Sequence, residues 1–180
     1  MNVEEVLDHV LAALERNHIA YMVAGSFASN VHGVPRATFD ADVVIETSLV
    51  DLETFVAESN EQFYVSLDAA REALMREGMF NLIHFETGFK IDLIARKSRP
   101  FSREEFSRRL EASCFGRSRW FASPEDVILS KLEWAKMGNS ERQLRDALNI
   151  AKVQGERLDR AYLEKWAKSI GVEDLLSKIL

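Results

Sequence analysis

Three aspartates in apolar segments are the residues of this sequence best suited to chemistry. Asp40 and Asp42 stand in the apolar run of residues 39–45, and Asp92 stands in that of residues 90–94. Side chains two apart in a strand lie on the same face, about 6.6 Å apart along the chain. Asp40 and Asp42 are therefore predicted to point the same way from one strand.

Such a pair predicts a cation between the carboxylates. Two carboxylates held side by side repel each other, and a strand at the centre of a domain would not keep them without a compensating charge. Oxygen ligands on a rigid strand suit Mg²⁺ or Mn²⁺, which commonly arrive with substrate phosphates. If the strand of Asp92 lies beside that of Asp40 and Asp42, three carboxylates converge on a two-metal site. That site can activate an attacking hydroxyl and stabilise a leaving pyrophosphate.

Each of these aspartates also has a purely structural interpretation. Asp40 and Asp42 could stand at a turn or an exposed strand edge, although the apolar residues 43–45 that follow argue against this. Asp92 could be an ion-pair partner of Lys90 or of a nearby arginine. The metal interpretation is preferred for all three.

A Gly-Ser pair supplies a second element of the predicted site. Gly25 and Ser26 follow the apolar run of residues 19–24, which we interpret as a buried strand. Glycine lets a phosphate approach the backbone, and a following helix presents free N–H groups and the positive end of its dipole. Ser26 is predicted to be the N-cap of a helix that runs to about His32, whether or not it also binds phosphate.

The order of these motifs resembles the DNA polymerase beta-like nucleotidyltransferase superfamily. Its members share an apolar-Gly-Ser pattern followed, here after residues 27–39, by Asp-x-Asp and apolar residues. The Arg-x-Thr-x-Asp-x-Asp run of residues 36–42 looks like the minimal and AbiEii-type branches, which include components of bacterial toxin–antitoxin and phage-defence systems. Residues 125–132 and 142–146 look, more loosely, like the Lys and Arg-Asp elements of AbiEii-type proteins.

The resemblance covers residues 19–155 and implies a reaction and a set of roles. An NMP would pass from an NTP to a hydroxyl of a tRNA end or other RNA, a partner protein or a small molecule. Mg²⁺ or Mn²⁺ would be held by the three aspartates, and Asp92 would also be the base for the incoming hydroxyl. Gly25 and Ser26 would hold the triphosphate, with Lys131 as a further contact.

A second function stays open on the same residues. The small size and the missing base-recognition motif are also typical of a non-catalytic binding module, for instance an antitoxin-like partner of a cognate toxin. Lys131 lies among apolar residues and could instead extend to water. Arg145 and Asp146 are interpreted as a solvated helix face, and Arg36 and Thr38 as braces of the loop before Asp40.

Composition sets broader limits. The chain has 180 residues with 47% hydrophobic residues, which suits one domain or two small ones packed together. The net charge is −6, so no overall field favours nucleic acid. Residues 96–119 carry a local excess of basic residues, which could serve phosphates or form a solvated face. Cys114 allows no internal disulfide and is interpreted as a buried or half-buried strand residue.

Targeting signals and metal-binding histidines are not expected. The acidic, amphipathic N-terminus differs from a signal peptide, and no apolar stretch approaches membrane-spanning length, so a cytoplasmic protein without a membrane partner is expected. The four histidines show no metal-ligand spacing and are interpreted as structural; they are His9, His18, His32 and His84.

Periodicity and turn signals predict an α+β nucleotidyltransferase fold, a small mixed sheet flanked by helices with a C-terminal helical bundle packed on it. The α/β core would span residues 1–122 and the helical region residues 123–180. Strands are predicted at 19–24, 39–45, 80–85 and 89–94, the last two as a β-hairpin around the short Gly-containing loop 86–88, with an extended segment at 113–121. Helices are predicted at 3–16, 26–32, 48–59, 67–77, 102–110, 124–137, 140–153, 159–169 and 172–180. Ser123 and Pro124 mark a helix start, and glycines are expected at helix ends, namely Gly78, Gly138, Gly155 and Gly171.

Overall fold

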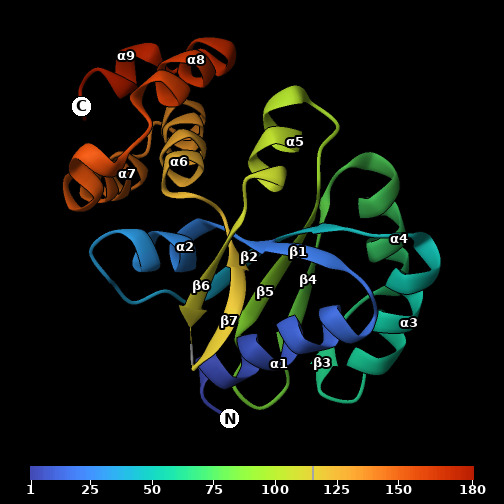
Figure 1. Ribbon diagram of the computed structural model, residues 1–180. Coiled ribbons are helices and arrows are strands. Elements are labelled where there is room, and N and C mark those ends of the chain that lie inside the picture. Colours follow the sequence, from blue (N-terminus) through green and yellow to red (C-terminus); the bar gives the residue numbers. More distant parts are fainter. Residues whose placement is uncertain (115) are drawn as a thin grey trace.

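A mixed α/β architecture is seen in the computed structural model, which describes residues 1–114 and 116–180 (Figure 1). The strands are β1 (Ala20–Val23), β2 (Asp40–Glu46), β3 (Phe63–Tyr64), β4 (Met79–His84), β5 (Lys90–Ala95), β6 (Leu110–Cys114) and β7 (Arg117–Phe121). The helices are α1 (Val3–Arg16), α2 (Gly25–His32), α3 (Leu49–Ser59), α4 (Leu67–Arg76), α5 (Pro100–Ser107), α6 (Pro124–Gly138), α7 (Glu141–Gln154), α8 (Arg160–Ile170) and α9 (Glu173–Leu176), with a 3-10 turn at Gly155–Arg157.

The strands form one seven-stranded sheet in the order β3-β4-β5-β2-β1-β7-β6. The pairs β2–β5 and β1–β7 are parallel, and the other neighbouring pairs are antiparallel. The predicted hairpin of residues 80–94 is confirmed as β4 and β5. The predicted extended segment 113–121 belongs instead to a second hairpin, β6 and β7, and its residue 115 lies outside the described residues.

Strand alternation gives the sheet a buried face and a polar one at its centre. Residues 41, 43 and 45 of β2 and 91, 93 and 95 of β5 are buried. Helix α4 packs on β4 and β5, α3 packs on α4, and α1 packs on β1 (Figure 1). The alternate residues, which include Asp40 and Asp42, are less buried and lie on the other face of the sheet.

Helices α6 to α9 gather at the end of the molecule where α2 lies (Figure 1). Both α6 and α7 pack against α2, so the C-terminal helices contact the element that follows β1. Ser123 caps α6 through its hydroxyl and Pro124 is the first helical residue, as the sequence predicts. The predicted helix 172–180 is shorter than expected, since α9 ends at Leu176.

Three helices end on a residue in the left-handed conformation. The sequence suggests glycine at each break, and Gly171 fills this position after α8. After α4 and α6, however, the left-handed residues are Glu77 and Asn139, each one position away from the expected Gly78 and Gly138. Among the described residues, no helix combines the length and the apolar content that a membrane span requires.

The basic residues of segment 96–119 are largely paired within the molecule. Arg96 pairs with Glu46, Arg99 with Glu133, Arg108 with Glu125, and Arg117 and Arg119 with Asp8. Arg119 is only 4% exposed and also pairs with Glu15, so these contacts join β7 to α1. The local excess of positive charge seen in the sequence is therefore mostly neutralised by acids from other elements.

Glu105 of α5 is a buried carboxyl group that faces α6. It accepts a hydrogen bond of 2.8 Å from the Ser130 hydroxyl. Burial raises the pKa of Glu105 to about 7, and the nearby Asp126 and Glu133 add to the rise, which Ser130 and Arg99 oppose. The folded protein therefore keeps a proton on Glu105 at pH values where the unfolded chain has lost it.

We expect the free energy of unfolding to fall as the pH rises from about 4.5 to 7, because the folded state binds the extra proton in that window. Glu105→Gln should remove this part of the pH dependence and stabilise the protein at pH 8. The gain should be at most roughly 3 kcal/mol, at 1.36 kcal/mol per pKa unit. Urea denaturation between pH 5 and 8 measures it, with the exposed Glu86→Gln as the matched control. Parallel pH profiles for wild type and Glu105→Gln would contradict this assignment.

Candidate active site

The parallel pairing of β2 with β5 brings the predicted carboxylates together. Asp42 lies directly opposite Asp92 in the register of the two strands, and Asp40 lies opposite Lys90. The expectation that the strand of Asp92 lies beside that of Asp40 and Asp42 is confirmed. Asp92 is only 5% exposed, whereas Asp40 and Asp42 are half-buried.

Negative charge is concentrated at Asp42. The pKa of Asp42 is raised to about 6, mainly by burial and also by the charges of Asp40 and Asp92, while Lys131 and Lys90 act in the opposite direction. A raised pKa means that the ionised form lacks sufficient compensating charge. This is the electrostatic condition under which a bound cation would stabilise the site.

Both oxygens of Asp92 have hydrogen-bond donors. The Asn81 side-chain amide, opposite Asp92 in β4, donates to Oδ1. The Lys90 ammonium group donates to Oδ2 at 2.8 Å. The ion pair that the sequence offered as the alternative for Asp92 is therefore present.

The donor chemistry suits Mg²⁺ or Mn²⁺, but the side chains are not arranged as a complete ligand set. Across residues 1–114 and 116–180, no group of three or more His, Cys, Asp or Glu side chains stands close enough to hold a metal ion. Carboxylate oxygens from one sheet face and the raised pKa of Asp42 nevertheless fit a hard divalent cation. Asn81 and Lys90 already bond the two oxygens of Asp92 that such a site would use.

Gly25 makes room for the Asp42 carboxylate. A Cβ atom at position 25 would lie 1.9 Å from Oδ2 of Asp42, and the Gly25 φ of +55° is in the left-handed region. The Ala24 N–H donates to the Asp42 carbonyl at 2.9 Å, which fixes the two segments side by side. Glycine is thus required at position 25 both by the backbone and by the close approach of Asp42.

Ser26 is not the N-cap that the sequence predicts. Helix α2 begins at Gly25, its N-cap is Ala24, and no side chain bonds to its first turn as a cap. The left-handed Gly25 starts the helix earlier than the Ser26 signal suggests. The Ser26 hydroxyl instead accepts a hydrogen bond of 3.0 Å from Arg36. Ser26 lies in the first turn of α2, whose N–H groups lack a side-chain cap.

Arg36 joins the loop before β2 to the C-terminal helices. Its guanidinium donates to both carboxylate oxygens of Asp146 in α7, at 3.1 and 2.8 Å, as well as to Ser26. The side chain of Asn30 bonds the backbone N–H and C=O of Arg36. Thr38 donates to the Asp40 carbonyl and carboxylate at 3.0 and 3.2 Å. Arg36 and Thr38 brace this loop, as predicted.

Lys131 and Asp146 form a buried ion pair between α6 and α7. The Lys131 ammonium donates to Asp146 and to the Gln143 amide oxygen, each at 3.0 Å, and Lys131 is 3% exposed. Burial lowers the pKa of Lys131, although Asp146 opposes the shift. Lys131 therefore does not extend to water, and it interacts electrostatically with Asp42.

Asp146 is also buried, so its interpretation as part of a solvated helix face is wrong, whereas Arg145 is exposed as expected. Burial alone would raise the pKa of Asp146, but the hydrogen bonds from Arg36 and Lys131 together lower it.

The sequence reasoning missed Asn81 of β4 as a partner of Asp92. Alternation along residues 79–83 could have placed Asn81 on the face of Asp92 only if the register of the hairpin were known.

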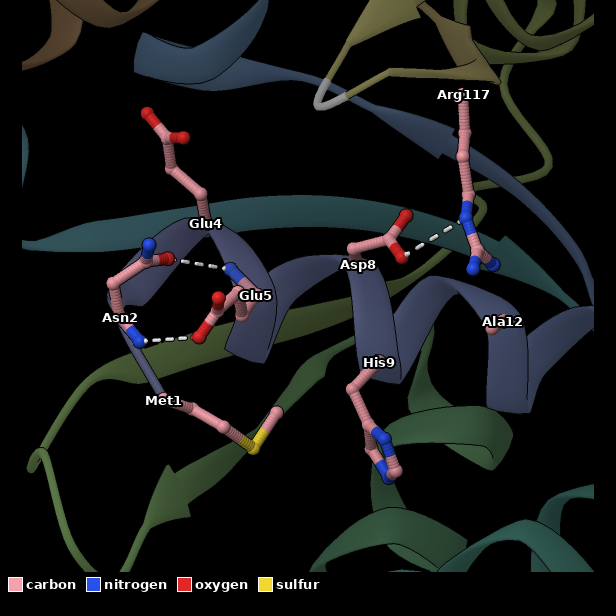
Figure 2. A pocket seen from close by; sticks show the side chains of 8 residues that line it. All are labelled: Met1, Asn2, Glu4, Glu5, Asp8, His9, Ala12 and Arg117. Carbon is pink, nitrogen blue, oxygen red and sulfur yellow. Dashed lines mark hydrogen bonds and ion pairs between the residues drawn. The ribbon is translucent and has the colours of Figure 1, made fainter.

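A hollow lies elsewhere, along α1 (Figure 2). It holds about 450 Å³, and its lining residues are Met1, Asn2, Glu4, Glu5, Asp8, His9, Ala12 and Arg117. Asn2 and Glu5 bond each other's backbone N–H groups in a capping box, and Asp8 pairs with Arg117 at 3.7 Å (Figure 2). None of the predicted site residues lines this hollow, and Asn2, Glu5, Asp8 and Arg117 in its lining already bond one another in pairs.

Among known proteins, this chain is similar to several solved structures. No family model and no curated protein matches the sequence. Among solved structures, the antibiotic-resistance factor ANT(2″)-Ia aligns with a TM-score of 0.61 and 15% identity over 92% of this chain and 94% of its own. The lincosamide antibiotic adenylyltransferase LnuA, with lincomycin bound, aligns with a TM-score of 0.58 and 13% identity over 84% and 98%.

A third solved structure widens the comparison beyond resistance enzymes. An antigenic nucleotidyltransferase-like protein from Paracoccidioides brasiliensis aligns with a TM-score of 0.61 and 15% identity over 97% of this chain and 91% of its own. Sequence identities this low establish a shared architecture rather than a shared substrate. The mixed seven-stranded sheet flanked by helices matches the nucleotidyltransferase fold of these structures.

Proposed function

We propose that this chain is a metal-dependent nucleotidyltransferase that moves an NMP from an NTP to an acceptor hydroxyl. The observation that carries the proposal is the register of β2 on β5, which places Asp42 beside Asp92 with Asp40 on the same face. The shared fold with nucleotidyltransferases supports it. The acceptor class includes RNA, protein and small molecules.

In this reaction the acceptor oxygen attacks the α-phosphorus of the NTP, and the bond to pyrophosphate breaks. Asp40, Asp42 and Asp92 would hold Mg²⁺ or Mn²⁺, which when bound activates the hydroxyl and stabilises the charge on the leaving pyrophosphate. Asp92 accepts the proton of the acceptor hydroxyl at a carboxylate oxygen.

The start of α2 is suited to bind the triphosphate. Gly25 has no side chain, and the first turn of α2 carries N–H groups without a side-chain cap. The Arg36 side chain is 30% exposed, and its guanidinium donates a hydrogen bond to Ser26. Lys131 adds positive charge from its buried position, and direct contact with the triphosphate would require it to release Gln143 or Asp146.

Small-molecule acceptors have the most support among the structural neighbours. ANT(2″)-Ia has been solved with adenylyl-2″-tobramycin and LnuA with lincomycin. A hydroxyl on a small polar molecule is therefore the acceptor to test first, before an RNA or a protein.

A non-catalytic binding module is the second candidate function. The observation that favours it is the Lys90–Asp92 ion pair, which occupies one of the three carboxylates. In that case the chain would bind nucleotide or a cognate partner of toxin–antitoxin type, in keeping with the AbiEii-type resemblance. Transfer of an NMP by the isolated chain would exclude this alternative.

Asp42→Asn should abolish transfer while it leaves the metal-free fold intact. The amide is a poor ligand, so the transfer rate should fall about 10³-fold or more. The substitution also removes an ionised group whose pKa burial has raised, so the metal-free variant should unfold at the same or a higher temperature at pH 7.5. Release of labelled pyrophosphate from ATP, GTP, CTP or UTP with Mg²⁺, together with thermal unfolding, measures both effects.

Asp68→Asn is the matched control, because the Asp68 carboxylate is 96% exposed on α4. Transfer that persists in Asp42→Asn at the wild-type rate would exclude Asp42 from the mechanism. Loss of folding in the metal-free variant would contradict the electrostatic account of this residue.

Gly25→Ala should impair transfer by displacing Asp42. The added methyl group would overlap the Asp42 carboxylate, and the left-handed backbone adds strain. We expect transfer to fall about 100-fold, because small displacements of reacting groups have effects of this size. The control is Gly88→Ala, which has a similar φ of +67° but an added Cβ that contacts nothing within 4 Å. Equal activity of the two variants would show that the contact with Asp42 has no role.

A further inference from the structure

Lys90 belongs to a group of four charged side chains on one face of the sheet, with Asp40, Asp42 and Asp92. In the register of β2 and β5, Lys90 lies opposite Asp40 and Asp92 lies opposite Asp42. Residues two apart in a strand share a face, so all four side chains lie on the same side of the sheet. Lys90 is therefore built into the carboxylate cluster and is not a distant surface charge.

The Lys90 ammonium group already compensates the charge of the cluster. It donates to Asp92 at 2.8 Å, and it also interacts electrostatically with Asp40 and Asp42. The hydrogen bond to Asp92 raises the pKa of Lys90, so the group stays charged at neutral pH. With Asn81 on the other oxygen, Asp92 has both oxygens engaged by donors.

Exposure shows which partner can leave. The Asp92 side chain is 7% exposed and fixed within the sheet, whereas the Lys90 side chain is 39% exposed. A long lysine side chain at the surface can move its ammonium group into water at a small cost. Release of Lys90 would free one oxygen of Asp92 without any movement of the backbone.

We propose that Lys90 is a removable internal counter-ion, which neutralises Asp92 in the metal-free protein and competes with the divalent cation for its carboxylate. The inference rests on the metal-binding role that the proposed function gives to Asp92. Lys90 lowers the affinity for the free cation and stabilises the empty site. A cation that arrives with a triphosphate meets less competition, because the phosphates offer the released ammonium group a new partner.

The test measures Mn²⁺ binding without nucleotide, by calorimetry, for wild type, Lys90→Met, Lys90→Arg and Lys97→Met. Lys90→Met should bind Mn²⁺ about tenfold more tightly, because the cation no longer has to displace a charge-assisted hydrogen bond between Lys90 and Asp92. Lys90→Arg keeps the charge and should bind like wild type. Lys97 is exposed, so its variant controls for the change in net charge alone.

Thermal unfolding provides a second readout. Without Mn²⁺, Lys90→Met should unfold at a lower temperature than wild type, since a buried carboxylate has lost its cation. Saturating Mn²⁺ should remove most of that difference. A purely structural ion pair predicts a loss of stability that Mn²⁺ does not restore.

Unchanged or weaker Mn²⁺ binding by Lys90→Met would overturn the inference, and so would an equal gain in Lys97→Met. Failure of the proposed function is distinguishable from this. Tight Mn²⁺ binding by Lys90→Met with no transfer by wild type would overturn the function and support the counter-ion role. Transfer by wild type with unchanged Mn²⁺ affinity in Lys90→Met would support the function and overturn the counter-ion role.

Discussion

The register of β2 on β5 is the constraint on which the candidate site depends. Side chains in a strand alternate between faces, so a slip of one residue would turn Asp92 toward the core and remove it from Asp42. The apolar residues that alternate with these aspartates, Val43 and Leu93 among them, are fully buried and hold the register. Packing on one face of the sheet thus fixes the chemistry on the other.

The negative charge of the site is partly compensated from two directions. On the sheet, Lys90 neutralises Asp92. From the C-terminal helices, Lys131 and Arg36 share the single carboxylate of Asp146, so this group carries a net positive charge beside Asp42. Burial makes the charges of Lys131 and Asp146 costly unless they are paired. The pairs that they form, together with Arg36, accompany the packing of α6 and α7 against α2. The C-terminal helices therefore contribute electrostatically as well as by packing.

Period-two alternation sufficed to predict that Asp40 and Asp42 share a face, and turn signals placed the β4–β5 hairpin. The neighbour of β2 could not be derived in this way, because strand order is a property of the whole sheet. Ser26 was misassigned because a left-handed glycine begins the helix before the capping signal. The burial of Asp146 cannot be derived from the sequence, because its partner Arg36 lies far away in the chain and only tertiary packing joins them.

The two-residue alternation of side chains along a strand, which predicts the metal site, also places Lys90 where it competes with the metal for Asp92. Lys90 and Asp92 are two apart, as Asp40 and Asp42 are, so any strand that presents Asp92 to a cation presents Lys90 beside it. A structural ion pair and a metal ligand are therefore not exclusive interpretations of Asp92. Buried beside Asp42 and bonded to Lys90, the Asp92 carboxylate is compensated by a cation in either state, and the difference in exposure between Lys90 and Asp92 determines which partner can be exchanged.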